Sequence, residues 1–197
     1  MGKMRIIGLT GGCGTGKSTV AGLLAEKGGY IIDADKLTVD LQKPGAAAYV
    51  EIVKWLGEDY LNADKTLNRR KIAELVFHNK ESLRKLNYIV HTKVSEEIKA
   101  SVAAIEAAYD DGFIVLDVPI PVERGFLDTA DVIWVVSAND DLRVERLMSR
   151  MNISENEAVS RINSQMSNRE YEELADVVIE NEKGIEELRR KVEEALE

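Results

Sequence analysis

A glycine-rich run near the start of the chain holds the residues with the clearest chemical purpose. Residues 11–18 read Gly-Gly-Cys-Gly-Thr-Gly-Lys-Ser and fit the pattern G-x-x-x-x-G-K-[ST] at each fixed position. Glycines let the backbone curl so that N–H groups point at phosphate oxygens, and a following helix adds the positive end of its dipole. The run therefore predicts a nucleoside triphosphate site, formed by Gly11, Gly12, Cys13, Gly14, Thr15, Gly16, Lys17, Ser18 and Thr19.

Within this run, a lysine and a serine have distinct expected roles. Lys17 can reach the β- and γ-phosphates, and the Ser18 hydroxyl can ligate Mg²⁺. Cys13 could be a redox-sensitive thiol activated by the helix dipole. A small side chain tolerated at a variable position is the simpler interpretation of Cys13.

Three aspartates stand where short apolar runs end. Asp33 and Asp35 follow the run Tyr30–Ile32, and Asp117 follows residues 113–116. The carboxyl ends of parallel strands face the ligand crevice, which favours a carboxylate there as base for an acceptor hydroxyl. We expect Asp33 to be that base and Asp35 to cap the helix that begins near Lys36. Asp117 has the pattern of a Walker B aspartate that acts on Mg²⁺ through water.

Arginines gather in the last third of the chain. Arg143, Arg146 and Arg150 share one face of an expected helix, and Arg161 lies on the next helix. They could form a lid that stabilises charge on a transferring phosphate. They could equally be a solvated face, with Glu157 and Arg161 as an ordinary i, i+4 pair. No Cys/His cluster has the spacing of a zinc site.

The elements that must position these residues alternate between strands and helices. Short apolar strands are expected at 4–9, 30–32, 113–116, 132–136 and 177–179, which is typical of a buried parallel sheet. Helices are expected from Lys17, at 69–78, 80–90, 93–109, 140–151 and 154–165, and at 184–196. The stretch from about 36 to 110 has no convincing strand and is interpreted as a helical insertion.

Composition limits the classes of function. The 197 residues are 45% hydrophobic, as in a globular protein, and 26 basic against 35 acidic residues give a net charge of −9. That charge disfavours nucleic acid or an anionic membrane as the main partner. One cysteine permits no internal disulfide, and no run approaches the roughly 18 apolar residues of a membrane span. A cytoplasmic protein with no obligate protein partner is expected.

Taken together, the motifs resemble the dephospho-coenzyme A kinase family of P-loop kinases. The pieces occur in the family's order over nearly the whole chain: residues 8–21, Asp33-Ala-Asp35, Leu67-Asn-Arg69, Val76-Phe77, Asp117-Val-Pro119, Glu123, Arg146-Leu147, Arg150, Arg161-Ile162, Gln165 and residues 175–181. The resemblance implies an α/β fold, the three-layer α/β/α P-loop NTPase type with a mostly parallel five-stranded sheet. It implies a single domain, with a core at 1–36, 111–139 and 166–197, an acceptor-binding insertion at about 37–110 and a lid at about 140–165.

The resemblance also implies an activity: transfer of the γ-phosphate of ATP to the ribose 3′-hydroxyl of dephospho-coenzyme A, with Mg²⁺. It implies that Asp33, Lys17 and Arg146 are catalytic. By the same resemblance Asp33, Arg69, His91 and Glu123 bind or shape the acceptor site, Ser18 and Asp117 (through water) hold the metal, and the lid carries Arg143, Arg146, Arg150 and Arg161.

The chain departs from the family pattern at three places. The family usually has His-Pro where this chain has His91-Thr92, Pro-Leu-Leu-x-Glu where it has residues 119–123 with Pro121, and glutamine where it has Arg143. A P-loop kinase of another nucleoside, nucleotide or small metabolite is the alternative. A guanine-nucleotide switch is disfavoured, because the nearest match to its Asn-Lys-x-Asp motif, Asn79-Lys-Glu-Ser82, lacks the aspartate.

Overall fold

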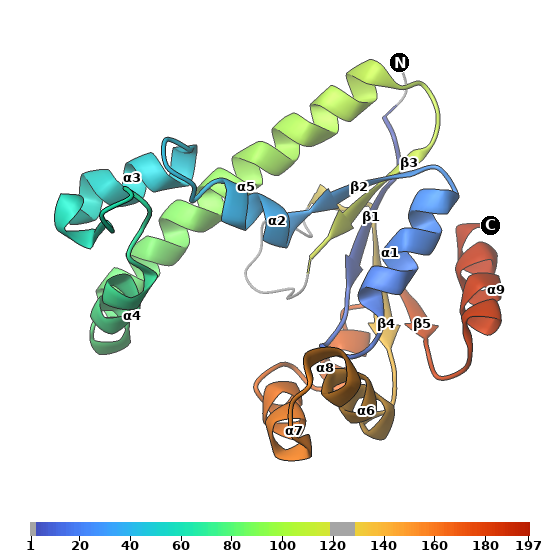
Figure 1. Ribbon diagram of the computed structural model, residues 1–197. Coiled ribbons are helices and arrows are strands. Elements are labelled where there is room, and N and C mark those ends of the chain that lie inside the picture. The colour runs from blue at the N-terminus through green and yellow to red at the C-terminus, as the bar shows by residue number, and fades with distance from the viewer. Residues whose placement is uncertain (1–2, 119–128) are drawn as a thin grey trace. The chain divides into compact units, whose positions relative to one another are not determined.

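A computed structural model describes residues 3–118 and 129–197 (Figure 1). Two compact units make up the chain. The first contains residues up to Asp33 and from Val102 onward, and the second contains Ala34–Ser101. Each unit is described by itself below.

The first unit is built on one sheet. Its strands are β1 (Ile6–Thr10), β2 (Gly29–Asp33), β3 (Phe113–Asp117), β4 (Val132–Ser137) and β5 (Val177–Glu180). They lie in the order β2-β3-β1-β4-β5, and each neighbouring pair is parallel. The prediction of a five-stranded parallel sheet is confirmed, with strand bounds shifted by one or two residues.

Both faces of this sheet are buried. Ile7 and Leu9 of β1 pack in a core with Val20 and Leu24 of α1 (Lys17–Glu26) and Leu188 of α9 (Ile185–Leu196). Residues of opposite parity, Ile6, Ile114 and Leu116, are buried as well. Alternate residues of a strand point to opposite faces, so burial of both sets explains the continuous apolar runs. The fold is the three-layer α/β/α type of the P-loop NTPases.

Three helices follow β4 in the first unit. They are α6 (Asp140–Met151), α7 (Glu155–Asn163) and α8 (Asn168–Glu172). Side-chain caps begin all three, from Asn139 for α6 and from capping boxes at Ser154 for α7 and Ser167 for α8. Leu147, Ala158 and Ile162 form a small core that joins α6 to α7. We did not expect α8 from the sequence.

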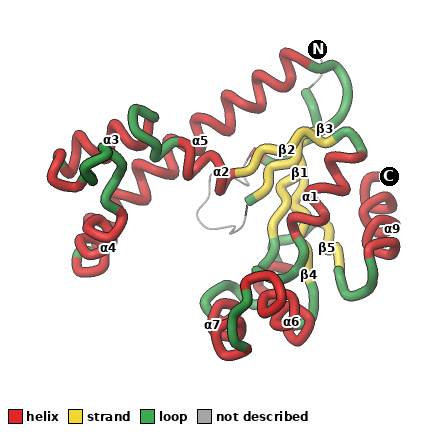
Figure 2. The backbone as a smooth tube through the Cα atoms, in the orientation of Figure 1, coloured by secondary structure: helices red, strands yellow, loops and turns green. Residues whose placement is uncertain are grey.

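The second unit consists of helices joined by loops (Figure 2). It contains α2 (Ala34–Asp40), α3 (Ala47–Leu56), the 3₁₀ turn η1 (Glu58–Tyr60), α4 (Arg69–His78) and the first part of α5 (Lys80–Ala108). Its core is centred on Ile52, Leu67 and Ile72. As expected, the described residues of this stretch form no strand, apart from one isolated bridge between Leu61 and Leu67.

Two expectations about helix ends are wrong. The helices expected at 80–90 and 93–109 form one helix of 29 residues, α5. Thr92 keeps the backbone N–H that a proline would lack, so nothing at this position interrupts the helix. Asp35 was expected to cap a helix near Lys36. However, α2 begins at Ala34, so Asp35 lies in its first turn, where a negative charge still favours the helix dipole.

None of the helices described at residues 3–118 and 129–197 is long and apolar enough to cross a membrane.

Candidate active site

Three of the predicted site elements meet at the carboxyl edge of the sheet. The glycine-rich loop follows β1, Asp33 ends β2 and Asp117 ends β3. Because β3 lies between β1 and β2, Asp117 stands opposite Leu9 on one side and opposite Asp33 on the other. Adjacent strands are about 4.8 Å apart, so Asp117 lies next to the strand that leads into the loop, and Asp33 lies one strand farther away. The structure thus brings together residues separated by about a hundred positions in the sequence.

The backbone of the loop depends on its glycines. Gly14 and Gly16 have φ angles of 81° and 93°, in the left-handed region that side chains other than glycine rarely adopt. Gly16 begins α1 without a side-chain cap, and no acidic residue occupies the first turn. The positive end of this helix therefore faces the loop, in an arrangement that suits an anion.

Lys17 and Asp117 form an ion pair across the site. Their side chains are only 16% and 13% exposed, so solvent screens the pair less than it would on the surface. Ser18 and Thr19 follow Lys17 on the first turn of α1 and are exposed. The start of α1 thus carries an ammonium group beside a carboxylate, followed by two exposed residues with hydroxyl groups.

Side chains from elements distant in the sequence hydrogen-bond the carbonyl groups of the loop. The Asn181 amide Nδ2 donates to the carbonyl of Thr15 at 2.8 Å. Arg146 donates through NH1 to the carbonyls of Gly14 (3.3 Å) and Thr15 (3.2 Å) and through NH2 to the carbonyl of Asn181 (2.9 Å). Burial lowers the pKa of the Arg146 guanidinium from its usual value, although the group is still a cation near neutral pH.

The backbone N–H and the backbone carbonyl of Cys13 are both hydrogen-bonded to side chains. Its N–H donates to Gln165 Oε1 at 2.7 Å, and its carbonyl accepts from Arg143 Nε at 2.9 Å. The Cys13 side chain packs against the small core of α6 and α7. Arg143 is buried, whereas Arg146 is partly exposed and Arg150 is exposed.

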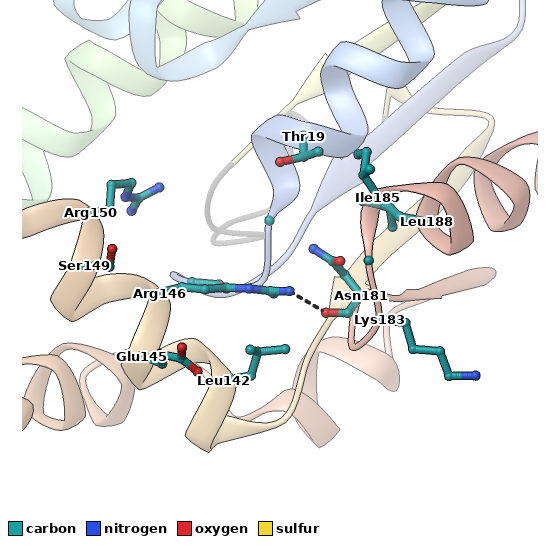
Figure 3. Close-up of a pocket in the computed structure, with 13 residues that line it drawn as sticks. Thr19, Leu142, Glu145, Arg146, Ser149, Arg150, Asn181, Lys183, Ile185 and Leu188 are labelled. Carbon is teal, nitrogen blue, oxygen red and sulfur yellow. Dashed lines mark hydrogen bonds between the residues drawn. The ribbon is translucent and has the colours of Figure 1, made fainter.

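A cavity of about 590 Å³ lies beside the loop (Figure 3). Arg146 and Arg150 of α6 border it, and Figure 3 shows the Arg146 side chain directed toward Asn181. Ile185 and Leu188 of α9 supply an apolar wall. The remaining wall comes from Gly14, Gly16, Thr19, Leu142, Glu145, Ser149, Lys183 and Gly184. The cavity has the size and mixed lining of a small-molecule site.

The other predicted lid and acceptor residues do not line this cavity or fall outside the described residues. Arg161 is exposed on α7, and its charge lowers the pKa of Glu157, although that pKa is lowered mainly by hydrogen bonds from Ser154. In the second unit, Arg69 opens α4 and borders a cavity of about 500 Å³, while His91 lies midway along α5. Glu123 and the departure at Pro121 fall outside the described residues.

The site also contains residues that were not predicted to belong to it. Asn181 and Gln165 bond the loop backbone directly, and Thr10 Oγ1 is buried at the end of β1 with no partner among the described residues. Both Asn181 and Gln165 belong to stretches that carry the family resemblance, and this resemblance is the sequence feature that could have identified them as site residues. Asn79, part of the discounted guanine motif, accepts from the N–H groups of Glu81 and Ser82 and so caps α5.

Comparisons with known proteins agree on one family. A family model described as dephospho-CoA kinase matches residues 5–187. The chain belongs to the dephospho-CoA kinase family. A dephospho-CoA kinase of Carboxydothermus hydrogenoformans is 41% identical over 187 residues, which cover 95% of this chain and 90% of that one.

Solved structures support the fold. A Thermus thermophilus crystal structure matches with a TM-score of 0.81 and 30% identity, over 99% of this chain and 97% of that one. A dephospho-CoA kinase from Campylobacter jejuni matches with a TM-score of 0.69 over 97% of this chain and 94% of that one. At 23% identity, this second likeness shows the shared fold.

Proposed function

We propose that this chain transfers the γ-phosphate of ATP to the ribose 3′-hydroxyl of dephospho-coenzyme A, which yields coenzyme A in the last step of its synthesis. Membership of the dephospho-CoA kinase family supports the activity. One structural observation carries the mechanism: the phosphate loop, Asp117 and Asp33 lie side by side at the ends of β1, β3 and β2. Phosphoryl transfer needs a phosphate cradle, a group for the metal and a base for the acceptor, and these three elements supply them.

ATP binds at the loop and the adjoining cavity in this proposal. The backbone N–H groups of the loop and the Lys17 ammonium hold the phosphates. The adenosine part lies in the cavity beside Gly14 and Gly16, where Ile185 and Leu188 offer an apolar wall to the base. As phosphate oxygens approach, Lys17 exchanges its bond to Asp117 for bonds to the β- and γ-phosphates.

The residues present fit a magnesium ion. Ser18 and Asp117 offer a hydroxyl and a carboxylate, and Mg²⁺ prefers oxygen ligands. Among the described residues no group of three or more His, Cys, Asp or Glu could hold a metal. Mg²⁺ usually takes one or two carboxylate ligands from the protein and completes its shell with water and substrate phosphates. When bound there, Mg²⁺ would offset the negative charge of the phosphates.

Asp33 acts as the base. It is exposed at the end of β2, one strand from Asp117 and two strands from the loop. A carboxylate there can accept the proton of the 3′-hydroxyl as that oxygen attacks the γ-phosphate. The helical insertion, at about 37–110, holds the acceptor, with contributions from Arg69, His91 and Glu123.

The segment at about 140–165 works as a lid that balances charge and excludes water. Arg146 and Arg150 border the cavity beside the loop, which supports a role for them near the phosphates. Arg161 is the third candidate. Water would compete with the acceptor hydroxyl and waste ATP, which gives lid closure its purpose.

The test measures ADP release from ATP and Mg²⁺ with dephospho-coenzyme A, adenosine, AMP or shikimate as acceptor. We expect stimulation by dephospho-coenzyme A alone, with the new phosphate on the 3′-oxygen. Stimulation by another acceptor would refute the substrate but not the phosphate loop. Slow hydrolysis with every acceptor would instead favour a nucleotide switch.

The base is tested by Asp33→Asn. We expect kcat to fall at least a hundredfold, the usual contribution of a general base being about 10²–10⁴, while the Kd of ATP changes little. Asp110→Asn is the matched control, since Asp110 is exposed and precedes β3 at the opposite end of the strand from Asp117. If Asp33→Asn instead weakened ATP binding and left turnover of bound ATP intact, Asp33 would not be the base.

A further inference from the structure

Arg143 is a buried cation that the proposed mechanism does not use. Its side chain is 1% exposed, although the sequence predicted either a lid residue that acts on the transferring phosphate or part of a solvated face. Burial of a charge is costly unless the group is paired and hydrogen-bonded. The contacts of Arg143 therefore indicate what the cation does there.

The guanidinium joins the phosphate loop to the residues that follow β4. Nε donates to the carbonyl of Cys13 at 2.9 Å, and NH1 donates to Asp140 Oδ1 (2.8 Å) and Asn168 Oδ1 (3.0 Å). Asn168 is fixed in turn, because its Nδ2 donates to the carbonyl of Ala138 at 2.8 Å. The Arg143 side chain thus links the Cys13 carbonyl to Asp140 and to Asn168.

The remaining nitrogen, NH2, packs against the loop itself. A Cβ built on Gly12 would lie 2.5 Å from NH2, and one built on Gly14 would lie 2.7 Å from the Arg143 carbonyl. NH2 is buried and has no hydrogen-bond partner among the described residues. An unmet donor carries a desolvation cost, which offsets part of what the other three hydrogen bonds of this guanidinium contribute to stability.

The backbone N–H of Cys13 is bonded as well, to Gln165 Oε1 at 2.7 Å. This N–H belongs to the peptide plane shared with Gly12, whereas the Cys13 carbonyl belongs to the plane shared with Gly14, so each of two successive planes is held by one bond. In the trans peptide that Arg143 bonds, the Gly14 N–H points away from the Cys13 carbonyl. The bond from Arg143 therefore sets where this loop N–H is aimed.

We propose that Arg143 is a positioning residue for ATP, which acts through the Cys13 carbonyl to keep the phosphate loop in its anion-binding shape and does not itself touch the phosphates. The inference rests on the proposed function in that ATP is the ligand of the loop. Arg143 stands where the family usually has glutamine, whose amide also has an N–H donor. Arg143→Gln therefore tests whether a neutral N–H donor at this position is sufficient.

The experiment compares Arg143→Met, Arg143→Gln and Arg169→Met. Arg169 is the matched control for loss of one positive charge, since it is 88% exposed on α8 and paired with Glu173. For each protein the Kd of ATP with Mg²⁺ is measured without acceptor, and kcat and both KM values are measured with dephospho-coenzyme A. Because the Kd needs no acceptor, it tests Arg143 even if dephospho-coenzyme A proves to be the wrong acceptor.

We expect Arg143→Met to raise the Kd and KM of ATP about tenfold, the scale of one lost charged hydrogen bond. The KM of dephospho-coenzyme A stays unchanged. Arg143→Gln regains most of the ATP affinity, and Arg169→Met matches the wild type. A general loss of structure would lower the fraction of active protein without this selective change and without rescue by glutamine.

Three results would overturn the proposal. They are normal ATP affinity in Arg143→Met, no rescue in Arg143→Gln, or a fall in kcat at unchanged KM for ATP, which would mean direct action on the transferring phosphate. Should Arg143→Met not fold, Gln165→Leu provides the second test. This substitution removes the acceptor of the Cys13 N–H, and by the same reasoning it should raise the Kd of ATP without changing the KM of dephospho-coenzyme A. An unchanged Kd of ATP in Gln165→Leu would also refute the proposal.

Discussion

Gly16 and Asn181 are predicted to be coupled, because one side chain occupies the space that the other would need. A Cβ built on Gly16 would lie 2.1 Å from Asn181 Nδ2, so Gly16→Ala must displace the amide and break its 2.8 Å bond to Thr15. Loss of that buried bond costs about 1–3 kcal/mol. The left-handed φ of 93° adds about 1–2 kcal/mol for any Cβ. Gly16→Ala alone should therefore cost about 2–5 kcal/mol.

The double variant should cost about the same as Gly16→Ala alone. Asn181→Ala loses the same bond to Thr15, about 1–3 kcal/mol. Once the amide is gone, the nearest remaining side-chain neighbour of a Gly16 Cβ is Arg146 NH1 at 3.9 Å, an ordinary contact. Only the backbone strain is then left to add. Asn181→Ala should accordingly have almost no effect in the Gly16→Ala background.

Urea unfolding of the four proteins without nucleotide measures this cycle. A coupling free energy of about 1–3 kcal/mol is expected, well above the roughly 0.5 kcal/mol seen for independent sites. Gly22→Ala is the matched control, since Gly22 lies on α1 and its Cβ would meet nothing within 4 Å. It should raise stability slightly and add independently to Asn181→Ala. Additive losses for Gly16→Ala and Asn181→Ala would refute the steric reasoning.

Two further predictions concern stability. The pKa of Asp131 is lowered by hydrogen bonds from Lys3 and from the Ile6 N–H (2.9 Å). The ionised carboxylate therefore stabilises the folded state fully above the unfolded pKa of about 3.9, and this stabilisation is lost as the pH falls through the lower folded pKa. Asp131→Asn should flatten the fall of Tm below about pH 4; an unchanged slope between pH 2 and 6 would contradict this. Ser154→Ala removes the capping box of α7 and should cost about 1 kcal/mol, or about 2–4 °C in Tm, while Ser160→Ala, on an exposed turn of the same helix, should leave Tm nearly unchanged.

The sheet could be predicted from the sequence because strands buried on both faces are apolar throughout. Residues 113–116 and 132–136 are such runs, and both proved to be strands. The break expected after residue 90 could not be judged from periodicity, since an apolar stripe continues through α5 and Thr92 permits the helix to continue. The start of α2 was missed because β2 passes into the helix with no intervening residue.

The phosphate loop and the strand-end carboxylates could be predicted for a similar reason. A motif identifies the loop, and the topology of a parallel sheet brings Asp33 and Asp117 to the same edge. The hydrogen bonds that hold the loop backbone could not be predicted. The bonds of Arg143, Gln165 and Asn181 to the loop span 130, 152 and 166 positions in sequence. Arg143 and Arg150 lie on nearly the same face of α6, and only Arg143, in the first turn, is buried; spacing alone does not give which turn meets the loop.

The residues that bond the loop backbone give a second reason for glycine at these positions. Glycine at these positions is usually attributed to the close approach of phosphate, but here protein atoms also occupy the space of a Cβ. Arg143 stands against Gly12 and Gly14, and Asn181 stands against Gly16. A side chain at any of these positions would push away a residue that bonds the loop backbone. The glycines are therefore required on the protein side of the loop as well as on the nucleotide side, and the shape that binds ATP is built by both.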